Sequence, residues 1–169
     1  MSRAVYDSPV GRLCVTADGD AITRLNWGGV ADGPPTALLA EALDQLAAYF
    51  AGTRTVFDLP FRVAGSEFQR AVCDAMLAIP FGATRTYGEI ARDLGASAQA
   101  VGSPVSAQAV GSHVSAQAVG NACGANPIPL FIPCHRVLGA NSLGGYSGAG
   151  GIETKVALLR HEGAAGLLL

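Results

Sequence analysis

A cysteine and a histidine stand side by side at residues 134 and 135, directly after a proline and an apolar segment at residues 128–132. A thiol with the ordinary pKa of about 8.5 is only slightly ionised at pH 7, and a neighbouring base is the usual means of activating it. Cys134 is therefore a candidate nucleophile and His135 a candidate base. The same pair is also compatible with a buried structural cysteine that happens to precede a histidine. Other motifs of the chain are needed to distinguish the two interpretations.

The sequence before residue 62 predicts a small sheet with one helix. Three segments rich in strand-forming residues are separated by turn residues, and a helical spacing of apolar residues follows a Gly/Pro-rich loop. The predicted strands cover residues 4–6, 13–17 and 21–27, and the predicted helix covers 38–50. We expect the strands to form an antiparallel sheet beside the helix, in a first domain that spans residues 1–61.

Helical patterns dominate after residue 61. One predicted helix covers residues 66–77, with Ser66 as a favourable N-cap, and a shorter one covers 87–94 and is ended by Gly95. We therefore expect an α+β protein whose second domain, residues 62–169, is mainly helical. The apolar stripe of the helix at 66–77 consists of Phe68, Val72, Cys73, Met76 and Leu77.

The composition favours a reduced, cytoplasmic protein. The 169 residues carry a formal net charge of −2, and the four cysteines show no C-x-x-C spacing and follow no signal peptide. No apolar stretch is long enough to span a membrane. Because the cysteines lack the paired spacing of metal ligands, we predict no structural zinc, and no cofactor is expected.

A six-residue sequence, Ser-Ala-Gln-Ala-Val-Gly, occurs three times with a period of nine residues, at 97–102, 106–111 and 115–120. These copies are too short for a solenoid, whose repeats usually span about 20 to 50 residues, so an insertion of extra copies is the simpler explanation. Pro104 disfavours a continuous helix through the first linker. We expect one copy to be the working helix and place the insertion at residues 97–114.

Several short motifs occur along the chain in the order found in one family. The chain closely resembles the O6-alkylguanine-DNA alkyltransferases, also called methylated-DNA–protein-cysteine methyltransferases, over nearly its whole length. The resemblance implies a ribonuclease H-like N-terminal domain and a C-terminal domain with a winged-helix-like helix-turn-helix. The motifs lie at residues 65–69, 79–82, 86–91, 118–120, 126–129, 133–137, 145–148 and 158–163.

The resemblance implies a chemistry for the cysteine. In this family a thiolate takes the alkyl group from O6 of guanine in DNA, and from O4 of thymine, and keeps it as a thioether, so each molecule reacts once. Cys134 would be the acceptor, and His135 would take its proton through a bridging water. Glu162 would orient the imidazole. Asn126 would hold the loop before the nucleophile, a role compatible with an ordinary Asx turn.

The same resemblance implies how the substrate is held. Because the reactive atom is buried in duplex DNA, the base must be flipped into a pocket, and the partner is double-stranded DNA approached by a monomer through the minor groove. Arg136 is expected to be structural. Residues expected to hold the base are Tyr87, Tyr146, Ser147 and Val137, and residues expected to contact the DNA are Gln117, Ala118, Gly120 and Thr86.

The helix expected to enter the minor groove departs from the family. The family motif usually reads Ala-Arg-Ala-Val-Gly, and its arginine fills the gap left by the flipped base, whereas the repeat carries glutamine. Counting back nine residues from Asn126 selects Gln117 in the third copy, although the other copies have the same local sequence. Glutamine brings no charge, so we expect weaker extrusion of the damaged base.

Two other functions stay open on these residues. One is a protein that binds damaged DNA but has lost efficient transfer through the glutamine and the insertion. Members of the family that only sense damage usually carry another residue in place of the nucleophilic cysteine, whereas this chain keeps Cys134. A Cys-His hydrolase would instead turn over an ester or amide many times. Covalent labelling that stops after one equivalent and depends on Cys134 distinguishes these functions.

Overall fold

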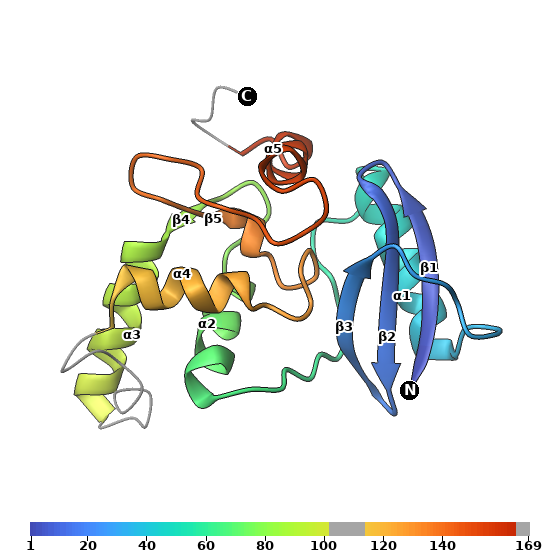
Figure 1. Ribbon diagram of the computed structural model, residues 1–169, viewed down its shortest axis with the longest axis horizontal. Coiled ribbons are helices and arrows are strands. Elements are labelled where there is room, and N and C mark those ends of the chain that lie inside the picture. Colours follow the sequence, from blue (N-terminus) through green and yellow to red (C-terminus); the bar gives the residue numbers. More distant parts are fainter. Residues whose placement is uncertain (102–113, 165–169) are drawn as a thin grey trace.

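The computed structural model describes residues 1–101 and 114–164, and it begins with a three-stranded sheet (Figure 1). Strands β1 (Ser2–Ser8), β2 (Gly11–Asp18) and β3 (Ala21–Trp27) pair antiparallel in that order. Gly11 and Gly19 have positive φ angles of 110° and 64° at the two tight turns, a region that glycine enters without steric cost. The predicted antiparallel sheet is confirmed, and its first two strands are longer than expected.

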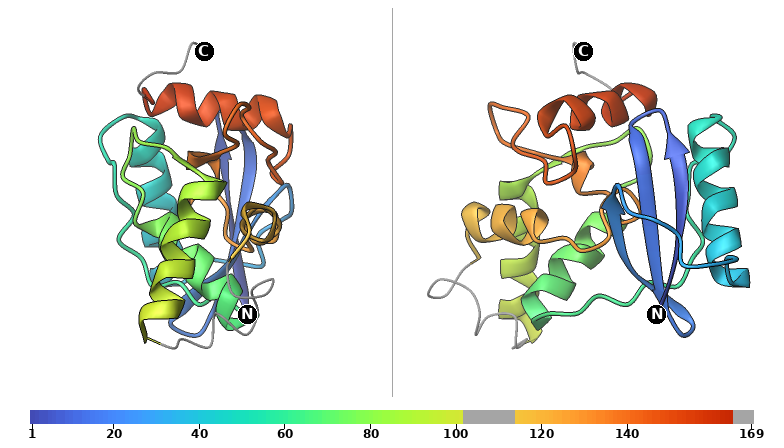
Figure 2. Two further views of the ribbon diagram at one scale, coloured as in Figure 1. Left: turned by 90° about the vertical axis from the view of Figure 1, so that its left-hand side faces the viewer. Right: turned by 45° about the vertical axis from the view of Figure 1, so that its right-hand side comes forward.

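Helix α1 (Ala37–Phe50) packs against β1 and β2, while β3 is the strand nearest the helical half of the molecule (Figure 2). The start of α1 is fixed by Thr36, whose hydroxyl accepts a hydrogen bond from the amide of Leu39 at 3.3 Å. One face of this helix is buried, but it differs from the predicted stripe of Leu39, Leu43, Leu46, Ala47 and Phe50, because Leu43 and Phe50 are only half-buried and Ala47 is exposed. That face includes Leu39, Ala42, Leu46 and Tyr49.

The second half consists of helices around a short parallel strand pair. Ser66 caps the first of these helices as predicted, because its hydroxyl accepts from the amide of Gln69 at 3.1 Å. The predicted apolar stripe of this helix is buried at four of its five positions. The expectation was wrong only for Leu77, which is 43% exposed in the last turn. The elements are α2 (Glu67–Leu77), β4 (Arg85–Thr86), α3 (Tyr87–Val101), α4 (Ala116–Gly124), the 3-10 turn η2 (Cys134–Arg136), β5 (Val137–Leu138) and α5 (Ile152–His161).

Helix α3 is longer than the sequence predicted. Gly95 was expected to end it, but the helix continues through the first repeat copy to Val101. A glycine inside a helix costs only about 1 kcal/mol, and the alanine-rich sequence that follows favours the helix. Gly95 is buried, and a Cβ there would lie 3.7 Å from the backbone nitrogen of Val114. The glycine therefore lets the chain that enters α4 pass close to α3.

The first and third repeat copies have different positions in the fold. The first copy lies in α3 up to Val101, whereas the third copy forms α4. Ser115 caps α4 by accepting from the amide of Ala118 at 3.0 Å, and the helix buries Val119 and Cys123. The second copy and Pro104 lie outside the described residues. The third copy thus forms a capped helix that packs against the core.

One hydrophobic core connects the sheet to the helices. It includes strand residues such as Leu25 and the whole predicted apolar run before the nucleophile. The amide of Leu25 donates to the carbonyl of Pro127 at 3.0 Å, and the rings of Phe57 and Phe131 meet edge to face at 4.8 Å. Among the described residues, no helix is both long and apolar enough to cross a membrane.

Candidate active site

The candidate nucleophile lies in the 3-10 turn that follows Pro133. Cys134 is 5% exposed, and the apolar residues before it are almost completely buried. Within that run Leu130 has a φ of 74°, a conformation that a residue with a branched side chain rarely adopts. The tight turn and the buried run fix the position of the thiol, so the predicted burial of this segment is confirmed.

Asn126 closes the loop that precedes the nucleophile. Its Nδ2 donates to the carbonyl of Ile132 at 2.8 Å, and its Oδ1 accepts from the amide of Ile128 at 3.0 Å. The side chain is buried, so each of these bonds satisfies a backbone group that water cannot reach. The expected Asx turn is therefore present, together with a second bond that ties the far end of the loop.

His135 and Glu162 are in direct contact. The Nε2 atom of His135 lies 2.7 Å from Oε2 of Glu162, and both side chains are buried. Arg136 donates to both carboxylate oxygens, from Nε at 2.8 Å and from Nη2 at 2.9 Å. The hydroxyl of Tyr49 donates to Oε2 at 2.7 Å. Glu162 thus accepts bonds from three side chains, and one of them comes from the N-terminal half.

These contacts determine the protonation states of the pair. Burial alone would raise the pKa of Glu162, but the hydrogen bonds from His135 and Arg136 outweigh it and lower the pKa to about 2. The ionised carboxylate holds the proton on Nε2 of His135, which leaves Nδ1 as the basic atom. That Nδ1 is buried and has no hydrogen-bond partner among the described residues. Burial also lowers the pKa of His135, so the imidazole is neutral and able to accept a proton.

The resting thiol is protonated. Burial raises the pKa of Cys134, while the hydrogen bond with Asn126 and the charge of Lys155 act in the opposite direction without cancelling it. A raised pKa means that the thiolate has to be generated at the moment of attack. The neutral imidazole of His135 is the adjacent base that can take this proton.

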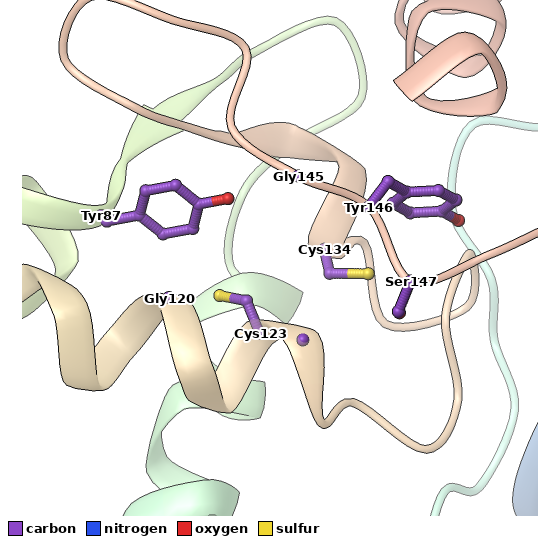
Figure 3. A pocket seen from close by; sticks show the side chains of 8 residues that line it. Tyr87, Gly120, Cys123, Cys134, Gly145, Tyr146 and Ser147 are labelled. Atoms are coloured by element: carbon purple, nitrogen blue, oxygen red, sulfur yellow. The ribbon is translucent and has the colours of Figure 1, made fainter. Parts of the chain in front are cut away.

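A cavity of about 280 Å³ opens beside Cys134, and we call it the acceptor pocket. Figure 3 shows Cys134, Cys123 and Tyr87 around one space, with the segment that carries Tyr146 and Ser147 passing beside the nucleophile. The pocket thus contains the predicted nucleophile and three of the four residues expected to hold the base. It is lined by Tyr87, Gly120, Cys123, Gly124, Cys134, Gly145, Tyr146 and Ser147.

Val137, the fourth residue expected to hold the base, is completely buried in β5 and does not line the acceptor pocket. Its carbonyl instead accepts from Nζ of Lys155 at 2.6 Å. Lys155 also donates to the carbonyl of Gly145 at 3.0 Å, and its ammonium lies 5.9 Å from the centre of the Tyr87 ring. Burial lowers the pKa of this lysine to about 8. Lys155 therefore connects β5 to the loop beside the pocket.

Trp27 supports the pocket loop from the N-terminal sheet. Its ring meets Tyr146 edge to face, with the centroids 6.0 Å apart, and its Nε1 donates to the carbonyl of Val10 at 3.0 Å. Between the two rings there is no room for a larger residue: a Cβ at Gly148 would lie 2.5 Å from Tyr146 and 2.7 Å from Trp27. The close approach explains why a glycine occupies this position.

The residues expected to contact DNA lie mainly along a second, more open cavity of about 560 Å³, which we call the outer groove. Thr86, Gln117 and Gly120 line it, while Ala118 is half-buried and packs against the core. The outer groove and the acceptor pocket share Tyr87 and Gly120, so they are neighbours. The groove is lined by Thr86, Tyr87, Gly88, Arg92, Ala116, Gln117, Gly120, Asn121, Gly139 and Ala140.

Sequence reasoning missed Tyr49, Lys155 and Trp27, and it understated Arg136. Nothing in the local sequence of Tyr49 or Trp27 distinguishes them from ordinary core aromatics. Lys155 is the single lysine of the chain and is completely buried, which only the fold reveals. Across the described ranges 1–101 and 114–164, no group of three or more His, Cys, Asp or Glu side chains could hold a metal ion.

Two family models match nearly the whole described chain. Residues 1–63 match the ribonuclease-like domain of 6-O-methylguanine DNA methyltransferase. Residues 67–107 and 104–164 match the DNA binding domain of the same family, and these two segments overlap inside the repeat.

Individual relatives are similar over most of their length. The methylated-DNA–protein-cysteine methyltransferase of Mycobacterium tuberculosis is 40% identical, over 92% of this chain and 88% of the relative. That of Methanosarcina acetivorans is 36% identical over 97% and 99% of the two chains. The crystal structure of Mycobacterium tuberculosis OGT in complex with DNA superposes with a TM-score of 0.73 at 40% identity, covering 94% of this chain and 91% of the other.

Proposed function

The chain belongs to the family of 6-O-methylguanine DNA methyltransferases, and on that premise we propose that it repairs alkylated DNA by moving the alkyl group from guanine O6 to the sulfur of Cys134. The observation that carries the assignment to Cys134 is its position in the wall of the acceptor pocket, next in sequence to a histidine bonded to a buried carboxylate. Transfer to O4-alkylthymine would use the same sulfur.

The reaction needs a base, a nucleophile and a leaving group. The proton of the Cys134 thiol passes through a bridging water to Nδ1 of His135, and Glu162 stabilises the imidazolium that forms. The thiolate then attacks the alkyl carbon in line, so a carbon–sulfur bond forms as the carbon–oxygen bond breaks. The electron pair of that bond returns to the guanine, which takes up a proton. Because the thioether is stable, each molecule acts once.

The substrate base has to leave the duplex to reach the sulfur. Flipping costs a few kcal/mol of unstacking, which contacts in the pocket must offset. The acceptor pocket offers Tyr87 as one wall and Ser147 at another, both suited to contact a guanine edge. Gln117 and Thr86 line the adjacent outer groove, where the duplex would lie. This arrangement supports a minor-groove approach by α4.

The oligomeric state, the location and the domain division form part of the same proposal. We assign the chain to the cytoplasm, since its four cysteines are all free thiols, as a reducing compartment would keep them. We further propose that it acts as a monomer. We divide it into residues 1–61 and 62–169, two parts that share contacts such as Tyr49 with Glu162. The curated relatives bear the name of a methyltransferase, which does not favour a sensor that binds damage without repairing it.

A fluorescent benzylguanine tests the transfer step without requiring DNA. Wild-type protein should become labelled to one equivalent and then stop, because the acceptor is consumed. Cys134→Ala should remain unlabelled, whereas Cys123→Ala, the control from the same pocket, should label. Absence of labelling in a folded wild type that binds alkylated DNA tightly would favour the sensor, and continued turnover would favour a hydrolase.

A further inference from the structure

The DNA-facing part of this protein is short of positive charge. No lysine or arginine occurs between Asp93 and Arg136, so α4 contributes none, and Arg136 is occupied by Glu162 inside the core. Binding to duplex DNA nevertheless depends on cations that neutralise phosphates and release counterions. Any such cation near the acceptor pocket must therefore come from another element.

Among the described residues that line the outer groove, only Arg92 is charged. It is exposed on α3, and its Nη1 atom lies 3.8 Å from the position that a Cβ on Gly88 would take, over the first turn of the helix. Gly88 directly follows Tyr87, which separates the groove from the acceptor pocket. Arg92 thus lies in the groove that adjoins the acceptor pocket.

The neighbouring charges leave Arg92 available. Arg85 is paired with Asp93 at 2.7 Å, whereas Arg92 forms no ion pair with any residue of the described ranges. Glu89, three residues before Arg92 on the helix, is engaged at the start of α3, where its carboxylate accepts from the amide of Thr86 at 2.9 Å. The hydroxyl of Thr86 in turn accepts from the amide of Glu89 at 3.1 Å. This reciprocal cap engages the carboxylate at the start of α3, and Glu89 forms no ion pair with Arg92 within the described ranges.

We propose that Arg92 binds a backbone phosphate of the alkylated strand, next to the nucleotide that enters the acceptor pocket. A phosphate flanking a base in the pocket would fall in the adjoining groove, since the two cavities share Tyr87 and Gly120. Arginine suits this contact because its planar guanidinium can bind two phosphate oxygens at once. The inference rests on the proposed function and adds the cation that Gln117 does not supply.

The salt dependence of binding to a short unmodified duplex tests this contact. Each phosphate contact contributes about 0.9 to the slope of log affinity against log salt. Arg92→Ala should reduce the slope by about that amount and weaken binding about tenfold at low salt. Arg92→Lys should retain the slope, because it retains the charge. Arg160→Ala removes an exposed arginine on α5, outside the groove, and should match the wild type.

Labelling with benzylguanine separates this inference from the proposed function. Arg92→Ala should react with the free base as fast as the wild type, since the guanidinium touches only the DNA. An unchanged salt slope in Arg92→Ala would overturn the inference, as would a loss of free-base labelling that Arg92→Lys does not restore. A wild type that never labels would instead overturn the proposed function, whatever the salt slopes are.

Discussion

Oε2 of Glu162 lies 2.7 Å from Nε2 of His135, and neither side chain is exposed to solvent. This contact assigns the free lone pair of the imidazole to Nδ1, the atom that has no partner among the described residues. Arg136 and Tyr49 hold the carboxylate from two other directions. His135, the proposed base, is thus oriented through Glu162 by groups from both halves of the chain.

Replacing Glu162 with glutamine should raise the apparent pKa of the thiol by about one unit or more, because the imidazolium–thiolate form loses a charged hydrogen bond. Labelling by benzylguanine at neutral pH should slow about tenfold or more for the same reason. The measurement is the labelling rate against pH, corrected for the folded fraction. Glu153→Gln, which changes an exposed acid in α5, the helix that Glu162 follows, is the control. An unchanged pH profile in Glu162→Gln would remove this carboxylate from the proton relay.

Asn126→Ala should destabilise the protein by about 1–3 kcal/mol, since it leaves the amide of Ile128 and the carbonyl of Ile132 unpaired in the core. The loop before Cys134 should also lose its fixed shape, so transfer should slow. Urea unfolding gives the free energy, and Asn26→Ala, at an exposed strand position, should change it by less than about 0.5 kcal/mol. Equal stability of the two variants would show that Asn126 does not hold the loop.

Lys155→Met should raise the apparent pKa of the Cys134 thiol, because the buried ammonium charge favours the thiolate. The carbonyls of Val137 and Gly145 also lose their donor, which should slow labelling. A stability measurement checks the lysine itself. Its pKa in the folded protein, about 8, is below the ordinary 10.5, so the unfolded chain binds more protons between these values.

The sign of this linkage is definite. The free energy of unfolding of the wild type, relative to Lys155→Met, should rise as the pH increases from about 8 to 10.5. Urea unfolding at several pH values in that window provides the comparison. Parallel curves for the two proteins would mean that the lysine titrates normally.

Gly148→Ala should displace Tyr146, since the added methyl group would overlap both Tyr146 and Trp27. Trp27 is the only tryptophan of the chain, so its fluorescence reports the change directly. We expect a shifted emission spectrum and lower stability. Gly145→Ala, where a Cβ meets nothing within 4 Å, is the matched control on the same loop. Identical spectra for the two variants would contradict the support of the pocket loop by Trp27.

The sheet, α1 and α2 could be predicted because their signals are local. Alternating strands, tight turns and the caps at Thr36 and Ser66 act within a few residues. The repeat shows where such signals end, because identical sequences have different structures. Ser97 lies inside α3, whereas Ser115 caps α4. The surrounding fold, which packs α4 against α2 and α3, decides between these outcomes.

The site was predictable where the family motif carries the chemistry and hidden where the fold carries it. Cys134, Tyr87, Tyr146 and Ser147 could be named in advance and do line one pocket. The contact of Tyr49 with Glu162 could not be predicted, because 113 residues separate the two in the sequence. Contacts of this kind depend on how the two halves pack, which no local pattern reports.

Intact mass after exposure to a duplex containing O6-methylguanine tests the central claim most directly. The wild type should gain the mass of one methyl group in place of a hydrogen, once per molecule, and peptide mapping should locate it on Cys134. Cys123→Ala, which changes the other cysteine of the acceptor pocket, should gain the same mass, and Cys134→Ala should gain none. A methyl group that maps to another residue, or that persists in Cys134→Ala, would contradict the assignment of Cys134 as the alkyl acceptor.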